Sequence, residues 1–297
     1  MKNGRRSNGK YADGQPYDVI QYMQAKLLLK PERVASLEQF RELGKRVQRT
    51  AKALKIGMLD DPRSLQPPSV REVVFIDTPD FRLYQNGFIL RRRIPYVDGF
   101  PAGEPEIVFK FRYPDLRKAA SLDVRPRIDG KYRIKFKSQA LPLKDHLGGY
   151  RLLYSHNCQF GISQAHDGDR TAMSTLARVF PPLATIKTSD GERVTLVNEG
   201  IVEELLMQLG KLDFGKGVVA KSNVALWRTR GDHTPIIGEY AFQAKFDRRE
   251  HIPDKIEKLA RQFFITLQHD VRDAIALGTT KTGLVYGLRG RTLERHE

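Results

Sequence analysis

Hydrophobic and polar residues alternate with a period of two along most of this chain, which is typical of half-buried β-strands. Turn-forming residues bound many of these segments. The pattern predicts strands over residues 19–29, 70–76, 88–93, 106–112, 121–125, 133–137, 150–160, 193–197, 201–206, 218–230 and 236–246. A chain with this many strands requires at least one large sheet.

Two long segments instead repeat apolar residues at steps of three and four, the spacing of one face of an α-helix. One runs from Val34 to Leu54, and the other begins at Pro253 and continues to Ile275. A shorter helix is expected over residues 171–179. Because most strands follow one another directly, the pattern predicts an α+β fold around an antiparallel sheet.

The length and composition suit one large domain. The chain has 297 residues, and 40% of them are hydrophobic, enough for a real core. We expect a disordered N-terminal tail over residues 1–16, a single domain over 17–277 with an insertion at about 141–182, and a C-terminal extension over 278–297.

Two absences in the sequence narrow the class of protein further. The single cysteine, Cys158, excludes an internal disulfide framework and a cysteine zinc cluster. The chain contains no run of about 18 apolar residues, and its first residues lack the apolar core of a signal peptide. We therefore expect a cytoplasmic protein without a membrane partner.

The charge is strongly positive and unevenly distributed. Lys and Arg number 51 against 35 Asp and Glu, a formal net charge of +16. Residues 82–137 hold 14 of these cations and 6 of the anions, so this stretch carries half of the excess. Such a balance indicates a polyanionic partner, and it leaves nucleic acid open as well as phosphates.

The cations in this stretch share one face of the predicted strands. In residues 106–112, the apolar Ile107, Phe109 and Phe111 alternate with Glu106, Val108, Lys110 and Arg112. The same spacing recurs in three further sets: Arg91 and Arg93; Ser121, Asp123 and Arg125; and Arg133, Lys135 and Lys137. Like charges on paired strands repel at separations of about 5 Å, so the pattern favours an anion among them.

The apolar side of this sheet must face the helices, which leaves the basic side for a different environment. If the sheet is open, the basic face is a solvated platform. If it closes into a barrel, the cations point inward and form a polar tunnel. Periodicity alone leaves both arrangements open.

Residues 75–83 (FIDTPDFRL) and 87–93 (GFILRRR) resemble the CYTH superfamily of triphosphate tunnel enzymes. That family has an aromatic-x-D-T-P-x-x-x-L segment before a glycine and an L-R-x-R strand. Residues 106–110 are similar to its E-x-x-x-K strand, and 236–245 fall where its late acidic strand belongs, so the resemblance covers roughly 19–246. It implies an antiparallel eight-stranded β-barrel, flanked by helices, that acts on triphosphates.

The resemblance also implies roles for individual residues, because basic side chains hold the phosphates in this family and glutamates hold a divalent metal. Lys26 takes the position of a catalytic lysine. The phosphate-binding positions are Arg91, Arg93, Lys110, Arg112, Arg125, Arg133, Lys135, Arg228 and Lys245. Glu106, Asp123 and Glu239 are the expected ligands of Mg²⁺ or Mn²⁺, with Glu203 or Glu204 as a further carboxylate.

Several acidic positions of the family are substituted in this chain. The opening E-x-E-x-K pattern falls on residues 22–26, where Tyr22 and Gln24 replace both glutamates. The final E-x-E-x-E pattern falls on 239–243, where Ala241 and Gln243 stand. The remaining carboxylates suffice for one metal ion rather than two.

The sequence is therefore compatible with three functions. The first is a metal-dependent phosphohydrolase acting on inorganic or organic triphosphate, or a related class IV adenylyl cyclase. The second is a catalytically lapsed tunnel that binds polyphosphate, nucleotide or RNA. The third is general RNA or DNA binding on an open sheet, which is poorly served because Phe109, Phe111 and Phe136 point away from the basic face.

Overall fold

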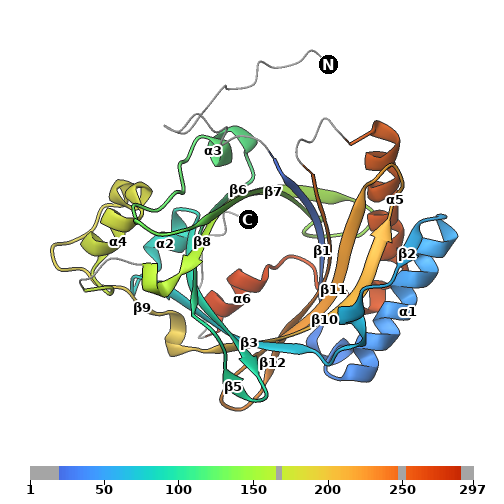
Figure 1. The fold of residues 1–297 in the computed structure, drawn as a ribbon, viewed down its shortest axis with the longest axis horizontal. Coiled ribbons are helices and arrows are strands. Elements are labelled where there is room, and N and C mark those ends of the chain that lie inside the picture. The colour runs from blue at the N-terminus through green and yellow to red at the C-terminus, as the bar shows by residue number, and fades with distance from the viewer. Residues whose placement is uncertain (1–19, 165–168, 247–251, 289–297) are drawn as a thin grey trace.

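The computed structural model describes residues 20–164, 169–246 and 252–288. Nine strands form a closed β-barrel (Figure 1). In their order around the ring they are β10 (Val202–Asp213), β11 (Val219–Thr229), β12 (Pro235–Lys245), β1 (Tyr22–Leu29), β7 (Arg133–Pro142), β8 (Tyr150–Gly161), β6 (Glu106–Tyr113), β4 (Phe88–Val97) and β3 (Ser69–Asp77). Pairing of β3 with β10 closes the ring, so the basic face of the sheet is not an open platform.

The expected helix-flanked barrel is confirmed, with two differences in detail. It has nine strands rather than eight, and β1 runs parallel to β7 while the other neighbours in the ring are antiparallel. The two differences have one cause. Strand directions can alternate all the way around a closed ring only when the number of strands is even, so nine strands require at least one parallel pair, and this ring has one.

Three short strands extend the sheet outside the ring: β2 (Gly57–Leu59), β5 (Phe100–Pro101) and β9 (Thr195–Leu196). The strand predicted over residues 121–125 is wrong. Residues 121–125 instead form a turn and loop that follow helix α3 (Leu116–Ala120). Asp115 accepts a hydrogen bond from the Lys118 amide (2.7 Å), and Asp123 accepts one from the Arg125 amide (2.9 Å). These local side-chain bonds satisfy amides that a strand would pair with a neighbour.

Two long helices cover one side of the barrel, α1 (Leu37–Ala53) and α5 (Asp254–Asp270), shown at the right of Figure 1. A reciprocal capping box begins α1: Ser36 Oγ accepts from the Gln39 amide, and Gln39 Oε1 accepts from the Ser36 amide. Their apolar stripes pack against outward-facing strand residues such as Leu27 and Tyr240. The predicted second helix ends five residues early, at Asp270, because a 3-10 turn (Arg272–Ala274) follows.

The opposite side of the barrel is covered by α4 (Met173–Val179) and the 3-10 turn Pro181–Thr185. Phe180 stacks on Phe109 of β6 with ring centroids 4.3 Å apart. Cys158 is fully buried in this core, and burial raises the pKa of its thiol. It is therefore a core residue and not a nucleophile.

One short helix lies inside the ring. Figure 1 shows α6 (Lys281–Gly287) within the outline of the barrel when it is seen end-on. Val285 and Tyr286 pack among Phe75, Ile89 and Trp227, which point inward from the strands. Helix α6 thus fills one part of the barrel with apolar contacts and leaves the rest as a polar cavity.

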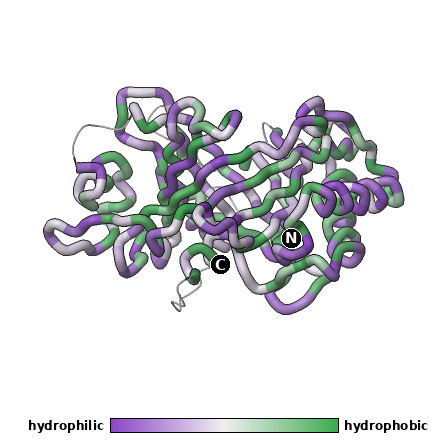
Figure 2. Tube along the Cα trace, turned by 90° about the horizontal axis from the view of Figure 1, so that it is seen from below, coloured by the Kyte–Doolittle hydropathy of each residue, from purple (hydrophilic) through white to green (hydrophobic). Residues whose placement is uncertain are grey.

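The hydropathy colours in Figure 2 interleave along the strands, as expected when one set of side chains meets the outer helices and the other meets the interior. The expected insertion at 141–182 contains β8, a strand of the ring, and the expected extension at 278–297 contains α6. The expected tail at 1–16 lies outside the described residues. Among the helices of the described ranges, none is long and apolar enough to cross a membrane.

Candidate anion-binding site inside the barrel

Strand alternation turns the basic face of the sheet toward the barrel interior. Arg91 and Arg93 point inward from β4, Lys110 from β6, and Lys135 and Lys137 from β7. They surround a cavity of about 450 Å³, a size typical of ligand sites. The charged residues that line it are Lys26, Arg71, Arg91, Arg93, Glu106, Lys110, Arg112, Arg133, Lys135, Lys137, Glu204, Glu239 and Lys281.

The balance of charge in this cavity is strongly positive. Ten of these thirteen residues are cations and three are carboxylates, a formal excess of +7. Solvent screens charges poorly in a protein interior, so mutual repulsion among the cations is costly there. The excess therefore calls for an anion.

The three carboxylates are already engaged by cations of the chain. Glu106 pairs with Arg93 and, at 3.3 Å, with Arg133. Glu239 lies 3.3 Å from the Lys26 ammonium and 2.8 Å from that of Lys281.

Glu204 is held by three contacts. It pairs with Arg71, lies 3.2 Å from the Lys281 ammonium and accepts a hydrogen bond from Trp227 Nε1 at 2.6 Å. Burial raises its pKa, but Arg71 and Lys281 outweigh burial and keep the pKa well below its usual value. Glu204 is therefore ionised in the ordinary pH range.

Two half-buried cations of the cavity lack any such partner. Within the described residues, neither the Lys110 ammonium nor the Arg91 guanidinium makes an ion pair, and Arg91 Nε has no hydrogen-bond acceptor. Lys135 and Lys137 are hydrogen-bonded only to neutral amides, those of Gln159 at 2.8 Å and Gln243 at 2.7 Å. None of these four cations has a carboxylate partner, so an anion in the cavity would stabilise them.

The pKa values of these groups report the same imbalance. Burial, reinforced by Arg112 and Lys26, lowers the pKa of Lys110 well below its usual value. Burial and Arg93 lower the pKa of Arg91 to about 9, and burial and Lys26 lower that of Lys137 to about 7. A bound anion would reverse these shifts, because it favours the charged form.

The expected metal ligands do not form a metal site. Glu106 and Glu239 line the cavity but have separate cation partners, and Asp123 lies outside it, paired with Arg125 at 2.9 Å. Across the described ranges, no three His, Cys, Asp or Glu side chains gather closely enough to hold a metal ion. The residues present therefore do not fit Mg²⁺ or Mn²⁺, which take oxygen ligands in regular geometry.

The structure brings most of the expected phosphate-binding residues together. Lys26, Arg91, Arg93, Lys110, Arg112, Arg133 and Lys135 line the cavity. Arg125 does not, because it lies in the loop after α3 and not on a strand of the ring. Arg228 follows the inward-facing Trp227 on the same strand, so it points to the outside of the barrel, where it pairs with Glu203. Lys245 ends β12 and is exposed.

Three cavity residues were not among the predicted phosphate-binding positions. Arg71 follows the same period-two spacing as the inward residues of β3, so the alternation carried a signal for it. Lys137 belongs to the basic alternation of its strand but has no match in the family pattern. Lys281 has no sequence signal, since only the folding of α6 into the ring brings it to the cavity.

The D-T-P segment has a structural role next to this cavity. Asp77 Oδ1 accepts hydrogen bonds from the amides of Thr78 (2.7 Å) and Leu83 (2.9 Å), and Oδ2 accepts from the Tyr84 amide and the Tyr286 hydroxyl, both at 3.0 Å. Burial raises the pKa of Asp77 to about 6, against the effect of these bonds. Asp77 thereby joins α2 (Arg82–Gln85) to the helix inside the barrel.

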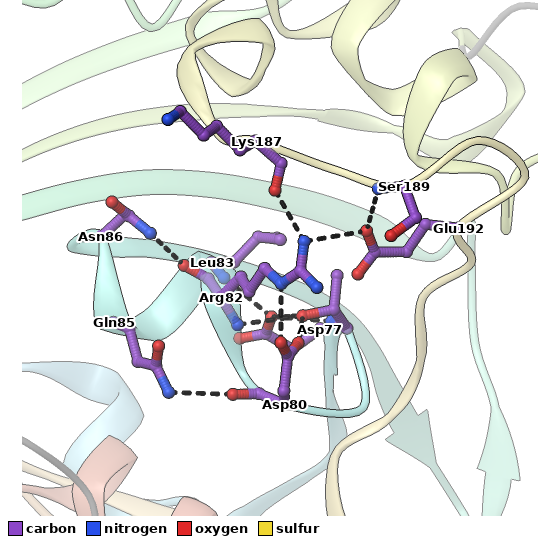
Figure 3. A network of polar contacts seen from close by, with 10 residues as sticks. Asp77, Asp80, Arg82, Leu83, Gln85, Asn86, Lys187, Ser189 and Glu192 are labelled. Atoms are coloured by element: carbon purple, nitrogen blue, oxygen red, sulfur yellow. Dashed lines mark hydrogen bonds and ion pairs between the residues drawn. The ribbon is translucent and has the colours of Figure 1, made fainter.

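Arg82 extends this network outward, as Figure 3 shows. Its guanidinium contacts Asp80 (2.6 Å), Glu192 (3.1 Å) and the Lys187 carbonyl oxygen (2.6 Å).

After α2, Gly87 takes a φ of +80°, and a Cβ there would meet the Arg112 carbonyl at 3.0 Å. The glycine of the sequence motif is thus required by backbone geometry.

No family model and no curated protein matches this chain. Solved structures that are similar include a protein from Hippeastrum, described as an adenylyl cyclase candidate with a dominant triphosphatase activity. It is 14% identical, covers 92% of this chain and 98% of its own, and has a TM-score of 0.41. A Pyrococcus horikoshii protein (14% identical, 90% and 99% covered, TM-score 0.37) and an adenylate cyclase candidate from Bacillus halodurans (14%, 83% and 91%, 0.35) are also similar.

Proposed function

We propose that this protein binds a linear triphosphate, or a short polyphosphate chain, inside its barrel. The observation that carries the proposal is the pair of cations, Lys110 and Arg91, that face the cavity and make no ion pair with a carboxylate among the described residues. They stand among eight further cations around one cavity. An extended polyanion can meet several of these groups at once, whereas a single small anion meets few.

Phosphate chemistry suits the side chains that are present. Guanidinium groups present several N–H donors in a planar fork that matches phosphate oxygens, and lysine supplies a point charge. Arg91, Lys110 and Lys137 come from three different strands and face the same space. Each phosphate oxygen could therefore receive charge-assisted hydrogen bonds from more than one wall.

Binding has more support here than metal-dependent hydrolysis. Glu106, Glu204 and Glu239 are all neutralised by cations of the chain, and no metal cluster forms in the part of the chain that the structure describes. Binding of long nucleic acid has less support, because that hypothesis required an open basic sheet, whereas the sheet closes and the basic face lies inside. A nucleoside triphosphate, or an RNA chain with a 5′-triphosphate, presents the same phosphate chain and would also suit this cavity.

The test compares two arginines that are adjacent on β4. Arg91 points into the cavity, whereas Arg92 points outward and pairs with Glu72 at 3.1 Å. Tripolyphosphate is titrated by calorimetry into the wild type, Arg91→Gln and Arg92→Gln, with EDTA present throughout. We expect binding by the wild type, a loss of about tenfold or more in Arg91→Gln, and little change in Arg92→Gln.

Equal losses in the two variants would mean nonspecific attraction by net charge and would contradict the proposal. Absence of binding by the wild type would contradict it outright. Phosphate release with Mg²⁺ or Mn²⁺, above that of Lys26→Ala and Lys110→Ala controls, would instead support a hydrolase.

A further inference from the structure

A lysine ammonium from α6 lies between two buried carboxylates of the barrel. Lys281 Nζ is 3.2 Å from Glu204 Oε1 and 2.8 Å from Glu239 Oε1. Glu204 is 1% exposed and Glu239 is 6% exposed. The carboxylates come from β10 and β12, and the ammonium comes from a helix that follows both strands in the chain. One cation therefore bridges two acidic groups that the strands alone would leave facing each other.

Every oxygen of these two carboxylates faces a cation. Arg71 pairs with Glu204 Oε2, and Lys26 lies 3.3 Å from Glu239 Oε2. Lys281 contacts the remaining oxygen of each carboxylate. Without Lys281, Glu204 would keep Arg71 and Glu239 would keep Lys26, but one buried oxygen of each carboxylate would lose its cation contact. Loss of a partner from a buried ion pair is destabilising.

The position of this ammonium is fixed by packing on several sides. Tyr286, in the same helix, donates a hydrogen bond to Asp77 (3.0 Å) and stacks on Tyr84 with ring centroids 4.3 Å apart. The Lys281 ammonium also lies 4.4 Å from the centroid of the Trp227 ring. These contacts hold Lys281 in one position, unlike an exposed surface lysine.

We propose that Lys281 is a built-in cation that takes the place of a divalent metal between Glu204 and Glu239. The ammonium keeps both carboxylates neutralised, and it presents a positive charge to the cavity without any metal. This proposal rests on the proposed function only for its effect on triphosphate binding. Its effect on the two glutamates stands on the geometry of the chain.

Removing the ammonium should expose a site for a metal ion. Methionine keeps most of the length and volume of lysine but carries no charge, so the two carboxylates lose the cation that they share. Paired carboxylate oxygens are ligands that Mg²⁺ and Mn²⁺ accept. Lys281→Met should therefore convert a metal-independent protein into one that responds to divalent cations.

The first experiment contains no phosphate. The thermal unfolding midpoint of the full chain is measured in EDTA and in MnCl₂ for the wild type, Lys281→Met and the double variant Lys281→Met, Glu239→Gln. We expect no response to Mn²⁺ in the wild type, and a lowered midpoint in Lys281→Met that Mn²⁺ raises by several degrees. The double variant should lose the response, because one of the two ligands is gone.

The second experiment measures tripolyphosphate affinity in EDTA and in Mn²⁺, with the wild type as the matched control. Lys281→Met should lose about tenfold or more in EDTA and recover with Mn²⁺. Lys281→Arg, which keeps the charge, should stay metal-independent. If no protein binds tripolyphosphate but Lys281→Met still responds to Mn²⁺, the proposed function fails while this inference stands.

A Lys281→Met protein that is as stable as the wild type in EDTA and does not respond to Mn²⁺ would overturn the inference. So would a wild type that itself needs Mn²⁺. If Lys281→Met does not fold in either condition, recovery of folding in the double variant supports the role of the ammonium, and failure to recover contradicts it.

Discussion

The two walls of the cavity differ in whether their cations are paired with carboxylates. The cationic wall consists of Arg91, Lys110, Lys135 and Lys137, on β4, β6 and β7, none of which contacts a carboxylate in the described residues. The neutralised wall consists of Lys26, Arg71, Glu204, Glu239 and Lys281, on β1, β3, β10, β12 and α6, where every carboxylate has cation partners.

This difference indicates that the two walls have different roles, one in anion binding and the other in maintaining the structure of the barrel. The neutralised wall is complete without a ligand, because its opposite charges and the packing of α6 hold one another. The cationic wall is incomplete, because its charges repel until an anion arrives. The proposed anion would therefore contact the cationic wall, whereas the neutralised wall maintains the shape of the cavity.

The largest effect should follow from dismantling the cationic wall. The double variant Arg91→Gln, Lys110→Met removes both unpaired cations. Since a hydrogen bond to a charged group contributes about 1.5–3 kcal/mol, we expect tripolyphosphate affinity to fall about 100-fold or more. Calorimetric titration in EDTA measures it. A double variant that binds as tightly as Arg92→Gln would show that the walls do not differ in this way.

The next largest effect should come from the support of the neutralised wall. Asp77 accepts hydrogen bonds from three buried amides and from Tyr286 of α6. Replacing it with alanine leaves those donors unsatisfied, so we expect the free energy of unfolding to fall by about 3 kcal/mol in urea denaturation. Asp80→Ala, at an exposed neighbour, should change it by less than about 1 kcal/mol. Equal losses of stability in the two variants would show that the hydrogen bonds of Asp77 do not stabilise the neutralised wall.

A smaller effect of opposite sign should follow from Lys110→Met alone. This change removes a half-buried cation that makes no ion pair among the described residues, so the ligand-free protein should gain about 1 kcal/mol of stability while its affinity for tripolyphosphate falls. Lys52→Met, on the exposed face of α1, is the control for loss of net charge and should change stability by less than about 0.5 kcal/mol. A destabilised Lys110→Met would mean that Lys110 is compensated in the ligand-free state.

The smallest effect is a proton taken up on binding. Burial and Lys26 lower the pKa of Lys137 in the folded chain from 10.5 to about 7. Between these values the unfolded chain binds a proton that the folded chain lacks, so this group makes stability rise with pH across that window. A phosphate chain favours the charged form, and binding roughly one unit above pH 7 should therefore take up a proton.

Calorimetry in two buffers with different ionisation enthalpies measures this uptake. Lys137→Met is the control, because it retains the uptake that belongs to tripolyphosphate itself. The wild type should take up more protons than this variant. Equal uptake in the two proteins would show that Lys137 is already charged before the anion binds.

Local pattern determined a large part of this protein. Alternation identified the strands of the ring and the inward direction of Arg91, Arg93 and Lys110, because side-chain direction in a strand repeats every two residues. It failed at 121–125, where Asp123 accepts a hydrogen bond from the Arg125 amide and the segment forms a turn and loop instead of a strand. Arg228, expected as a phosphate-binding residue, follows the inward-facing Trp227 directly and therefore lies on the opposite face of its strand.

The number of strands, the closure of the ring and the partner of each charge were decided by the tertiary structure alone. Closure depends on the pairing of β3 with β10, two segments separated by more than a hundred residues, and no local period encodes such a pairing. The same holds for Lys281, which meets Glu204 and Glu239 only because α6 folds into the barrel. The sequence by itself determined that cations share one face, since that follows from residue order. Whether each cation meets a carboxylate or none depends on distances across the ring, which only the folded chain sets.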